Sequence, residues 1–150
     1  CRERTYDGEP AMKLESAAAR GRPEPWDLVF SRNRGAETLS SRALMESALA
    51  RLQEAPAGDR HAVLDIAASF QYNLARGIAQ LAINAAQNNG MKAVALSGGV
   101  AYNRMIRETI RSEVTDASLS CLISHTEPLG DGCVSFGQCV YAGALGRQRA

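Results

Sequence analysis

The chain has 150 residues, of which 45% are hydrophobic and 22% are charged, a composition that suits a single folded domain over residues 1–150. Its 17 basic and 16 acidic side chains give a formal net charge of +1, which offers no surplus of positive charge for a nucleic-acid partner. No segment has the length and hydrophobicity of a membrane span, and the charged N-terminal residues do not resemble a secretory signal. We therefore expect a cytoplasmic domain that binds neither a membrane nor nucleic acid.

The N-terminal half of the chain is predicted to contain a helix, a hairpin and two further helices. Pro10 suits the first turn of a helix, and Ser40 and Ser41 can cap the helix that follows the hairpin. In chain order the predicted elements are a helix over 8–20, strands over 26–32 and 36–39, and helices over 41–53 and 59–88. Apolar residues of the longest helix recur every three or four positions and predict one buried stripe: Val63, Ile66, Phe70, Leu74, Ile78, Leu81 and Ala85.

After residue 90 the pattern changes to short apolar runs that alternate with helical segments. Residues 92–96 (KAVAL) are predicted to form a buried strand, and residues 119–124 a second strand. Each strand is followed by a glycine-containing turn and a helix, with Met105, Ile106 and Ile110 facing inward in the first of these helices. A strand–helix–strand–helix order predicts parallel strands and an α/β layered fold.

The four cysteines do not form a recognisable metal or disulfide motif. Cys1, Cys121, Cys133 and Cys139 include no CxxC pair and no spacing typical of a disulfide framework, so we expect reduced thiols. Cys121 and His125 would lie roughly 13 Å apart on one strand, too far to share a zinc ion directly.

The turn Ser97-Gly98-Gly99 is the first candidate for a binding site. Consecutive glycines let a backbone approach a ligand closely, and the helix that follows offers free amide groups to an anion such as phosphate. Ligands of open parallel sheets bind at the carboxyl ends of the strands, where this turn is expected. A tight connection that binds nothing would explain the two glycines equally well.

The second candidate is the glycine-rich segment 125–138, HTEPLGDGCVSFGQ, which also leads from a strand into a helix. Asp131 at the start of that helix can act as an N-cap, the role that chemistry alone favours. Its carboxylate could instead bind a divalent cation beside a nucleotide phosphate. Because the two glycine turns follow neighbouring strands, we expect them to flank one cleft.

Four segments together resemble the C-terminal portion of the HypF carbamoyltransferase family, which matures [NiFe]-hydrogenases. SGGVAYNRMIRE and EPLGDGCVSFGQCVYA match its two glycine turns, and TYDGEPAMKLESAA is similar to its YEG-x-A-A-x-x-LE segment. AASFQYNLARGIAQLA is similar to the helix usually written A-x-x-FH-x-x-LA. The resemblance covers nearly the whole chain in the same order. It implies one lobe of an actin-like (ASKHA) ATPase fold, with a mixed sheet and packed helices.

The resemblance implies a function for a longer protein of which this chain would be the C-terminal lobe. Such an enzyme uses carbamoyl phosphate and ATP to make carbamoyl-adenylate and transfers the carbamoyl group to a cysteine of a HypE-like acceptor protein. Its partners would include the remaining lobe and a YrdC-like domain of the parent chain. We expect the isolated lobe to be inactive, and no catalytic residue is assigned.

The resemblance also assigns roles to individual residues. It places Gly98, Gly99 and Asn103 beside the nucleotide, although Asn103 could equally be a polar residue of a helix start. Gly8 and Glu15 match the segment near the nucleotide, while a solvated helix position explains Glu15 at least as well. Asp131 matches the aspartate that binds a divalent metal.

The chain departs from the family pattern at two positions, and two alternatives to the HypF-like function stay open. Gln71 stands where the family has histidine, and Cys133 follows Asp131 and Gly132 where the family has a second glycine. An amide can donate and accept hydrogen bonds but cannot act as a base near neutral pH. The alternatives are a TsaD-like lobe that transfers threonylcarbamoyl groups to tRNA and a non-catalytic nucleotide-binding module.

Overall fold

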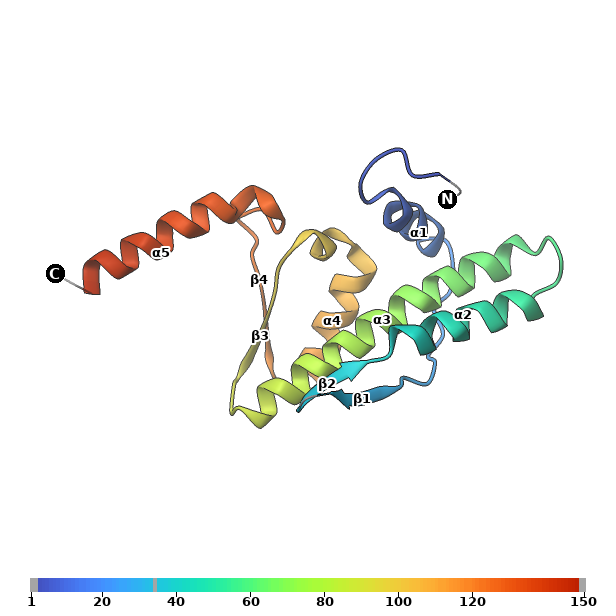
Figure 1. Cartoon of the computed structure of the whole chain (residues 1–150), viewed down its shortest axis with the longest axis horizontal. Helices are drawn as coiled ribbons and strands as arrows, with labels where there is room; N and C mark the ends of the chain where they lie inside the picture. The colour runs from blue at the N-terminus through green and yellow to red at the C-terminus, as the bar shows by residue number, and fades with distance from the viewer. Residues whose placement is uncertain (1–2, 34, 149–150) are drawn as a thin grey trace.

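A computed structural model of the protein describes residues 3–33 and 35–148. Cys1, and Arg34 between the two predicted hairpin strands, therefore lie outside the described residues. The order of helices and strands predicted from the sequence is confirmed (Figure 1). The elements, including the short 3-10 helices η1 and η2, are α1 (Glu9–Ala18), β1 (Phe30–Asn33), β2 (Ala36–Leu39), α2 (Ser41–Glu54), α3 (Arg60–Asn88), β3 (Ala93–Leu96), η1 (Gly99–Tyr102), α4 (Arg104–Asp116), β4 (Ser120–Ile123), η2 (Asp131–Cys133) and α5 (Val134–Gln148).

Short polar side chains cap the N-termini of α2 and α3. The Ser40 hydroxyl accepts a hydrogen bond from the backbone N–H of Ala43 (3.2 Å) at the start of α2. The Asp59 carboxylate accepts from the N–H groups of His61 (2.9 Å) and Ala62 (3.1 Å) at the start of α3. Since the first amides of a helix have no partner within it, these caps fix where the helices begin.

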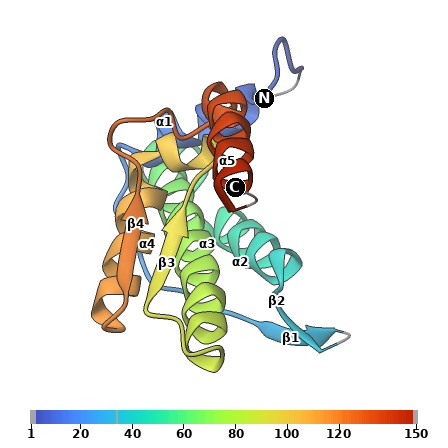
Figure 2. The ribbon, with the colours of Figure 1, turned by 90° about the vertical axis from the view of Figure 1, so that its left-hand side faces the viewer.

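The described strands form two small sheets rather than the single mixed sheet predicted from the sequence. β1 and β2 form an antiparallel hairpin in which Phe30 lies opposite Leu39. β3 and β4 run parallel, with Ala93 opposite Ser120, as their connection through α4 requires. Both α3 and α4 cover one face of the β3–β4 sheet (Figure 2). The mixed α/β layered class is confirmed, in a form richer in helix than in strand.

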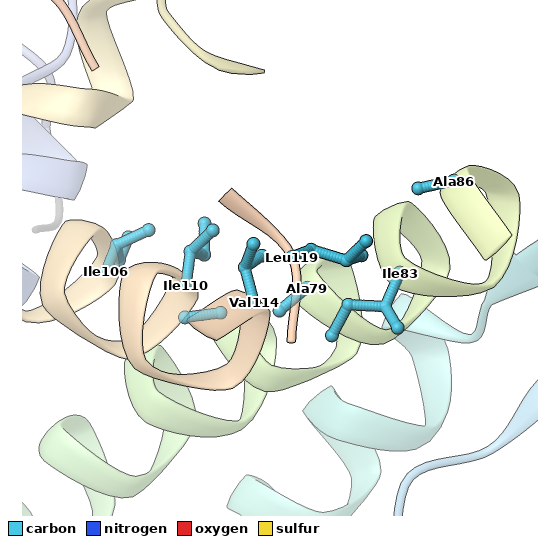
Figure 3. Close-up of a cluster of buried hydrophobic side chains, with 8 residues drawn as sticks. Ala79, Ile83, Ala86, Ile106, Ile110, Val114 and Leu119 are labelled. Carbon is cyan, nitrogen blue, oxygen red and sulfur yellow. The ribbon is translucent and has the colours of Figure 1, made fainter. Parts of the chain in front are cut away.

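The principal core lies between α3, α4 and the β3–β4 sheet (Figure 3). Its buried side chains are Ala75, Ala79, Ile83 and Ala86 of α3, Ile106, Ile110 and Val114 of α4, and Leu119. A smaller cluster joins Ala18 of α1 to Ala67 and Ala68 of α3. The inward positions predicted for Ile106 and Ile110 are therefore confirmed, and Met105 packs against the smaller cluster.

The apolar stripe predicted for α3 is largely wrong. Val63, Ile78 and Ala85 are exposed, whereas the buried face consists mainly of small or polar side chains. α3 approaches its neighbours closely, and close helix packing favours small residues at the contact. At Gly77, for example, a Cβ atom would overlap the side chain of Leu39 in β2.

The segment between α1 and β1 is extended and held against α3 by Asn73. Asn73 is fully buried, and its Oδ1 accepts from the backbone N–H of Trp26 (2.8 Å) and from Arg76 (3.0 Å). Its Nδ2 donates to the carbonyl groups of Glu24 and Ser69, each at 2.7 Å. These four bonds satisfy the whole Asn73 amide and dock residues 24–26 beside the helix.

α5 extends away from the other helices, and the side chains of residues 134–147 are exposed (Figure 1). They include the large apolar residues Val134, Phe136, Val140, Tyr141 and Leu145. Among the described residues, no helix combines the length and hydrophobicity that crossing a membrane requires.

Candidate functional site

The first glycine turn follows β3 and adopts a backbone conformation that requires glycine. Gly98 has φ +97° and ψ 166°, a region that side-chain-bearing residues rarely enter. Its N–H donates to the carbonyl of Leu129 at 2.6 Å, and the hydroxyl of Ser97 donates to the same carbonyl at 3.2 Å. This turn therefore bonds directly to the start of the second glycine segment.

Tyr102 joins the two glycine turns from the other side. Its hydroxyl accepts hydrogen bonds from the backbone N–H groups of Leu129 (3.1 Å) and Gly130 (3.4 Å). A Cβ atom at Gly130 would lie 3.2 Å from the Tyr102 ring and 3.8 Å from the Cα of Gly99. The two turns therefore lie side by side, and that they flank one ligand-binding cleft stays a prediction.

A groove of about 620 Å³ opens beside the first turn, between α1, α3 and the η1–α4 junction. We call it the α1–α3 groove. Four of the five residues that the sequence assigns to the nucleotide line it: Gly8, Glu15, Gly99 and Asn103. Phe70, Leu74 and Ile106 supply apolar walls. Small-molecule sites usually measure about 300–1,000 Å³ and combine apolar walls with a few polar groups, and this groove meets both criteria.

Asn103 and Gln71 form a buried polar pair in this groove. Asn103 is 8% exposed and Gln71 is 4% exposed. Asn103 Oδ1 accepts from the N–H of Ile106 at 3.1 Å and so caps α4, while its Nδ2 donates to Gln71 Oε1 at 3.2 Å. Asn103 therefore lies at the N-cap position rather than inside the first turn, and it also lines the groove.

α1 forms the opposite wall and places one carboxylate beside the groove. Gly8 precedes α1 with φ +79°, and Glu15, two turns later, is partly buried in the groove lining. Glu9 does not line the groove; its carboxylate accepts from Lys13 (2.6 Å) and from the N–H of Thr5 (2.6 Å). These bonds, with the Lys13 bond the largest cause, lower the pKa of Glu9.

The chemistry of the groove is that of a binding site. Among the described residues that line it, Glu15 is the only carboxylate, and there is no histidine, lysine, arginine or cysteine. Nucleophilic or acid–base catalysis needs such groups next to one another. The groove can hold and orient a polar, flat molecule, and it presents no catalytic dyad of its own.

Gly98 and Asp131 do not belong to the groove lining. Asp131 is exposed at the start of η2, on the turn that Tyr102 holds against Gly99. Within residues 3–33 and 35–148, no three metal-binding side chains (His, Cys, Asp or Glu) cluster together. One exposed carboxylate does not hold a divalent ion by itself, so the described residues do not form a complete metal centre.

A second groove, of about 410 Å³, lies between α1, α2 and α3. All of its lining side chains are apolar, among them Met45, Leu49 and Phe70. A polar ligand would lose hydrogen bonds to water there without replacement, so this groove is a poor candidate for one.

Sequence reasoning did not identify Tyr102 or the Gln71–Asn103 pair as parts of the site. The hydrogen bond between Gln71 and Asn103 joins positions 32 residues apart, which no spacing rule predicts. Tyr102 gave a weak signal, because an aromatic hydroxyl three residues after a double glycine can reach a neighbouring loop.

Comparison with known proteins places the chain in a family. Residues 1–138 match the family model described as carbamoyltransferase, Kae1-like domain, second subdomain. The chain is 28% identical over 138 residues to a probable carbamoyltransferase HypF of Methanocaldococcus jannaschii, covering 92% of this chain but 17% of that protein. It is 33% identical over 132 residues to a tRNA N6-adenosine threonylcarbamoyltransferase of Acaryochloris marina, covering 78% of this chain and 34% of the relative.

Solved structures support the same assignment. The crystal structure of T. kodakarensis HypF is similar with a TM-score of 0.78 and 39% identity, over 94% of this chain and 17% of that one. A full-length HypF in a phosphate- and nucleotide-bound form shares the fold, with a TM-score of 0.82 at 21% identity, over 97% of this chain and 18% of that one. The chain thus spans about a sixth of each HypF protein named here. It is a mixed α/β subdomain of the Kae1-like (ASKHA) fold and belongs to the HypF-like carbamoyltransferase family.

Proposed function

We propose that this chain is the C-terminal lobe of a HypF-like carbamoyltransferase and that its α1–α3 groove binds the nucleotide. The observation that carries the proposal is the convergence of Gly8, Glu15, Gly99 and Asn103, from two separate segments, on one groove. Its volume of about 620 Å³ is suitable for a nucleoside, and its polar groups lie beside apolar walls.

The two ends of a nucleotide would meet different surfaces. The apolar side chains of Phe70 and Leu74 can pack against a base, and the Glu15 carboxylate can accept hydrogen bonds from ribose hydroxyl groups. The glycine turn that opens η1 would face the phosphates through the backbone of Gly99, because the N–H of Gly98 is bonded to the Leu129 carbonyl and free backbone amides favour anions.

In the whole protein, ATP and carbamoyl phosphate would form carbamoyl-adenylate with release of pyrophosphate and inorganic phosphate. The carbamoyl group would then pass to a cysteine thiol of a HypE-like acceptor, and AMP would leave. This lobe would contribute binding and orientation, because the described residues of its groove present a single carboxylate, Glu15, and no catalytic dyad. Asp131 would provide one ligand of a divalent metal whose other ligands come from the remaining lobe. A YrdC-like domain of the parent chain would complete the enzyme.

Calorimetry of the whole protein with ATP and Mg²⁺ tests the nucleotide site. A Cβ built on Gly99 meets no atom within 4 Å beyond its chain neighbours and its own helical turn, so the position has room for a side chain beside the groove. We expect Gly99→Val to abolish binding. Gly143→Val, at an exposed position of α5 with similarly open surroundings, should leave binding unchanged. No detectable binding of millimolar ATP by the unsubstituted protein would refute the proposal.

Threonylcarbamoyl transfer to tRNA is a second candidate, favoured by the similarity to such transferases. The formal net charge of +1 supports it less, because tRNA-binding surfaces are usually rich in positive charge. Salt-dependent binding of tRNA by the whole protein would favour this candidate. Transfer of a carbamoyl group to a protein cysteine, without tRNA binding, would favour the HypF-like function.

Asp131→Ala in the whole enzyme tests the metal role. If Asp131 binds the metal, this substitution should remove carbamoyl-phosphate-dependent exchange between ATP and pyrophosphate. Retained exchange would limit Asp131 to a structural role at the start of η2.

A further inference from the structure

Gln71 lines the α1–α3 groove with a side chain whose orientation is fixed by its neighbours. It projects from α3 and is 96% buried, since 4% of its surface is exposed. The backbone N–H of Ile106 can only donate, so the Asn103 atom that faces it must be Oδ1. Asn103 then presents Nδ2 to Gln71, and Gln71 must accept with Oε1.

This chain of hydrogen bonds leaves one group of Gln71 unused. Its Nε2 carries two N–H donors, and no described residue accepts from them. Trp26 Nε1 is the only fully enclosed side-chain nitrogen or oxygen without a partner among residues 3–33 and 35–148. The Nε2 of Gln71 is therefore not fully enclosed by the protein, and the residue that carries it lines the groove.

We propose that Gln71 is a specificity-determining residue that donates a hydrogen bond from Nε2 to an acceptor atom of the nucleoside. This inference rests on the proposed nucleotide site and adds the atom that recognises the ligand. The acceptor is N1, N3 or N7 of the adenine or the 2′-oxygen of the ribose, because the phosphates would face the glycine turn. Asn103 is a positioning residue. Its bond from the N–H of Ile106 in α4 fixes its own amide, and its Nδ2 then fixes the orientation of Gln71.

The assignment explains why an amide suits this position. A carboxylate could accept from Asn103 but could not donate to the ligand, and an aliphatic side chain could do neither. A neutral imidazole can accept through one ring nitrogen and donate through the other. Gln71→His should therefore retain ATP binding at neutral pH, whereas Gln71→Glu should lose affinity.

Calorimetric titration of the whole protein with Mg-ATP tests the assignment. Loss of one neutral hydrogen bond to a ligand should raise the Kd about tenfold in Gln71→Met, whose side chain has a similar length. Gln87→Met, the same change at an exposed position of α3 outside the groove, serves as the matched control and should leave the Kd unchanged.

Titration of the unsubstituted protein with nucleotide analogues tests the same hydrogen bond without depending on whether a substituted protein folds. The 1-deaza, 3-deaza and 7-deaza analogues and 2′-deoxy-ATP each remove one candidate acceptor. We expect one of them to bind the unsubstituted protein about tenfold more weakly, and we expect Gln71→Met to bind that analogue and ATP equally.

The outcomes separate this inference from the proposed function. If the unsubstituted protein binds ATP but Gln71→Met binds within twofold of it, the role of Gln71 is wrong and the nucleotide site stands. Equal affinity of the unsubstituted protein for ATP and all four analogues would also overturn the role of Gln71. If the unsubstituted protein binds no ATP, the proposed function fails and this assignment fails with it.

Discussion

The hydroxyl oxygen of Tyr102 lies 3.1 Å from the backbone nitrogen of Leu129 and accepts its hydrogen bond. The two residues are 27 positions apart, so the contact joins η1 to the turn that precedes η2. Because Gly98 also donates to the Leu129 carbonyl, both backbone polar groups of Leu129 are held by residues of the segment 98–102. The two turns should consequently respond together to substitution or to a ligand.

Tyr102→Phe tests this coupling. Removing the hydroxyl should cost about 0.5–1.5 kcal/mol locally and loosen residues 129–132 without unfolding the domain. We expect faster hydrogen exchange at the Leu129 and Gly130 amides and several-fold weaker nucleotide binding. Tyr141→Phe, on the exposed α5, is the control and should change neither. Unchanged exchange at both amides would show that the turn does not depend on Tyr102.

Gly98→Ala should destabilise the fold through backbone strain. At φ +97° an alanine would be held in a region reserved for glycine, at a cost of about 1–3 kcal/mol. Gly143→Ala lies within exposed α5 and should instead increase stability by about 0.5–1 kcal/mol. Urea unfolding of both variants measures the difference. Equal stability of the two would mean that the turn relaxes to a conformation open to alanine.

Asn73→Ala should be among the most destabilising polar substitutions in the chain. It removes four hydrogen bonds and strands the backbone N–H of Trp26 and the carbonyl of Glu24, at a cost of about 2–4 kcal/mol. Asn84→Ala removes exposed hydrogen bonds on the same helix and should cost under about 1 kcal/mol. Chemical denaturation of both variants would contradict the account if the two losses were equal.

Glu9 should make stability depend on pH in the acid range. Hydrogen bonds from Lys13 and Thr5 lower its pKa from the ordinary value of 4.5. A carboxylate with a lowered folded-state pKa contributes stability above its unfolded pKa, and this contribution is lost as pH falls through the folded value. The difference in Tm between the protein and Glu9→Gln should therefore be largest near pH 6 and shrink below about pH 4. A difference that is constant from pH 6 to pH 3 would argue against the ionised pair.

The element order could be predicted from sequence because each segment carries its own local signal. Ser40 caps α2 as predicted, α3 begins after Asp59, where the sequence predicted its start, and the period changes after Gly90. The buried face of α3 could not be predicted in the same way, because the rule searches for large apolar side chains. The buried face instead contains Ala75 and Ala79, whose small side chains allow α4 to pack closely against α3, whereas the larger Val63 is exposed.

Those residues of the candidate site that belong to contiguous sequence motifs could also be predicted from the sequence. The glycines and Glu15 were found through motifs, which are contiguous in sequence. Gln71 appeared only as a departure from a family pattern, and its pairing with Asn103 depends on how α3 crosses the start of α4. Three-dimensional packing decides such contacts, so a single sequence cannot supply them.

Photoaffinity labelling of the whole protein with an azido derivative of ATP, followed by peptide mapping, tests the central claim most directly. The account predicts labelling within residues 8–15, 70–74 or 99–106, which line the α1–α3 groove, and protection by excess ATP. Labelling that excess ATP prevents, but that falls only within residues 41–54 of α2 or elsewhere outside the groove, would contradict it.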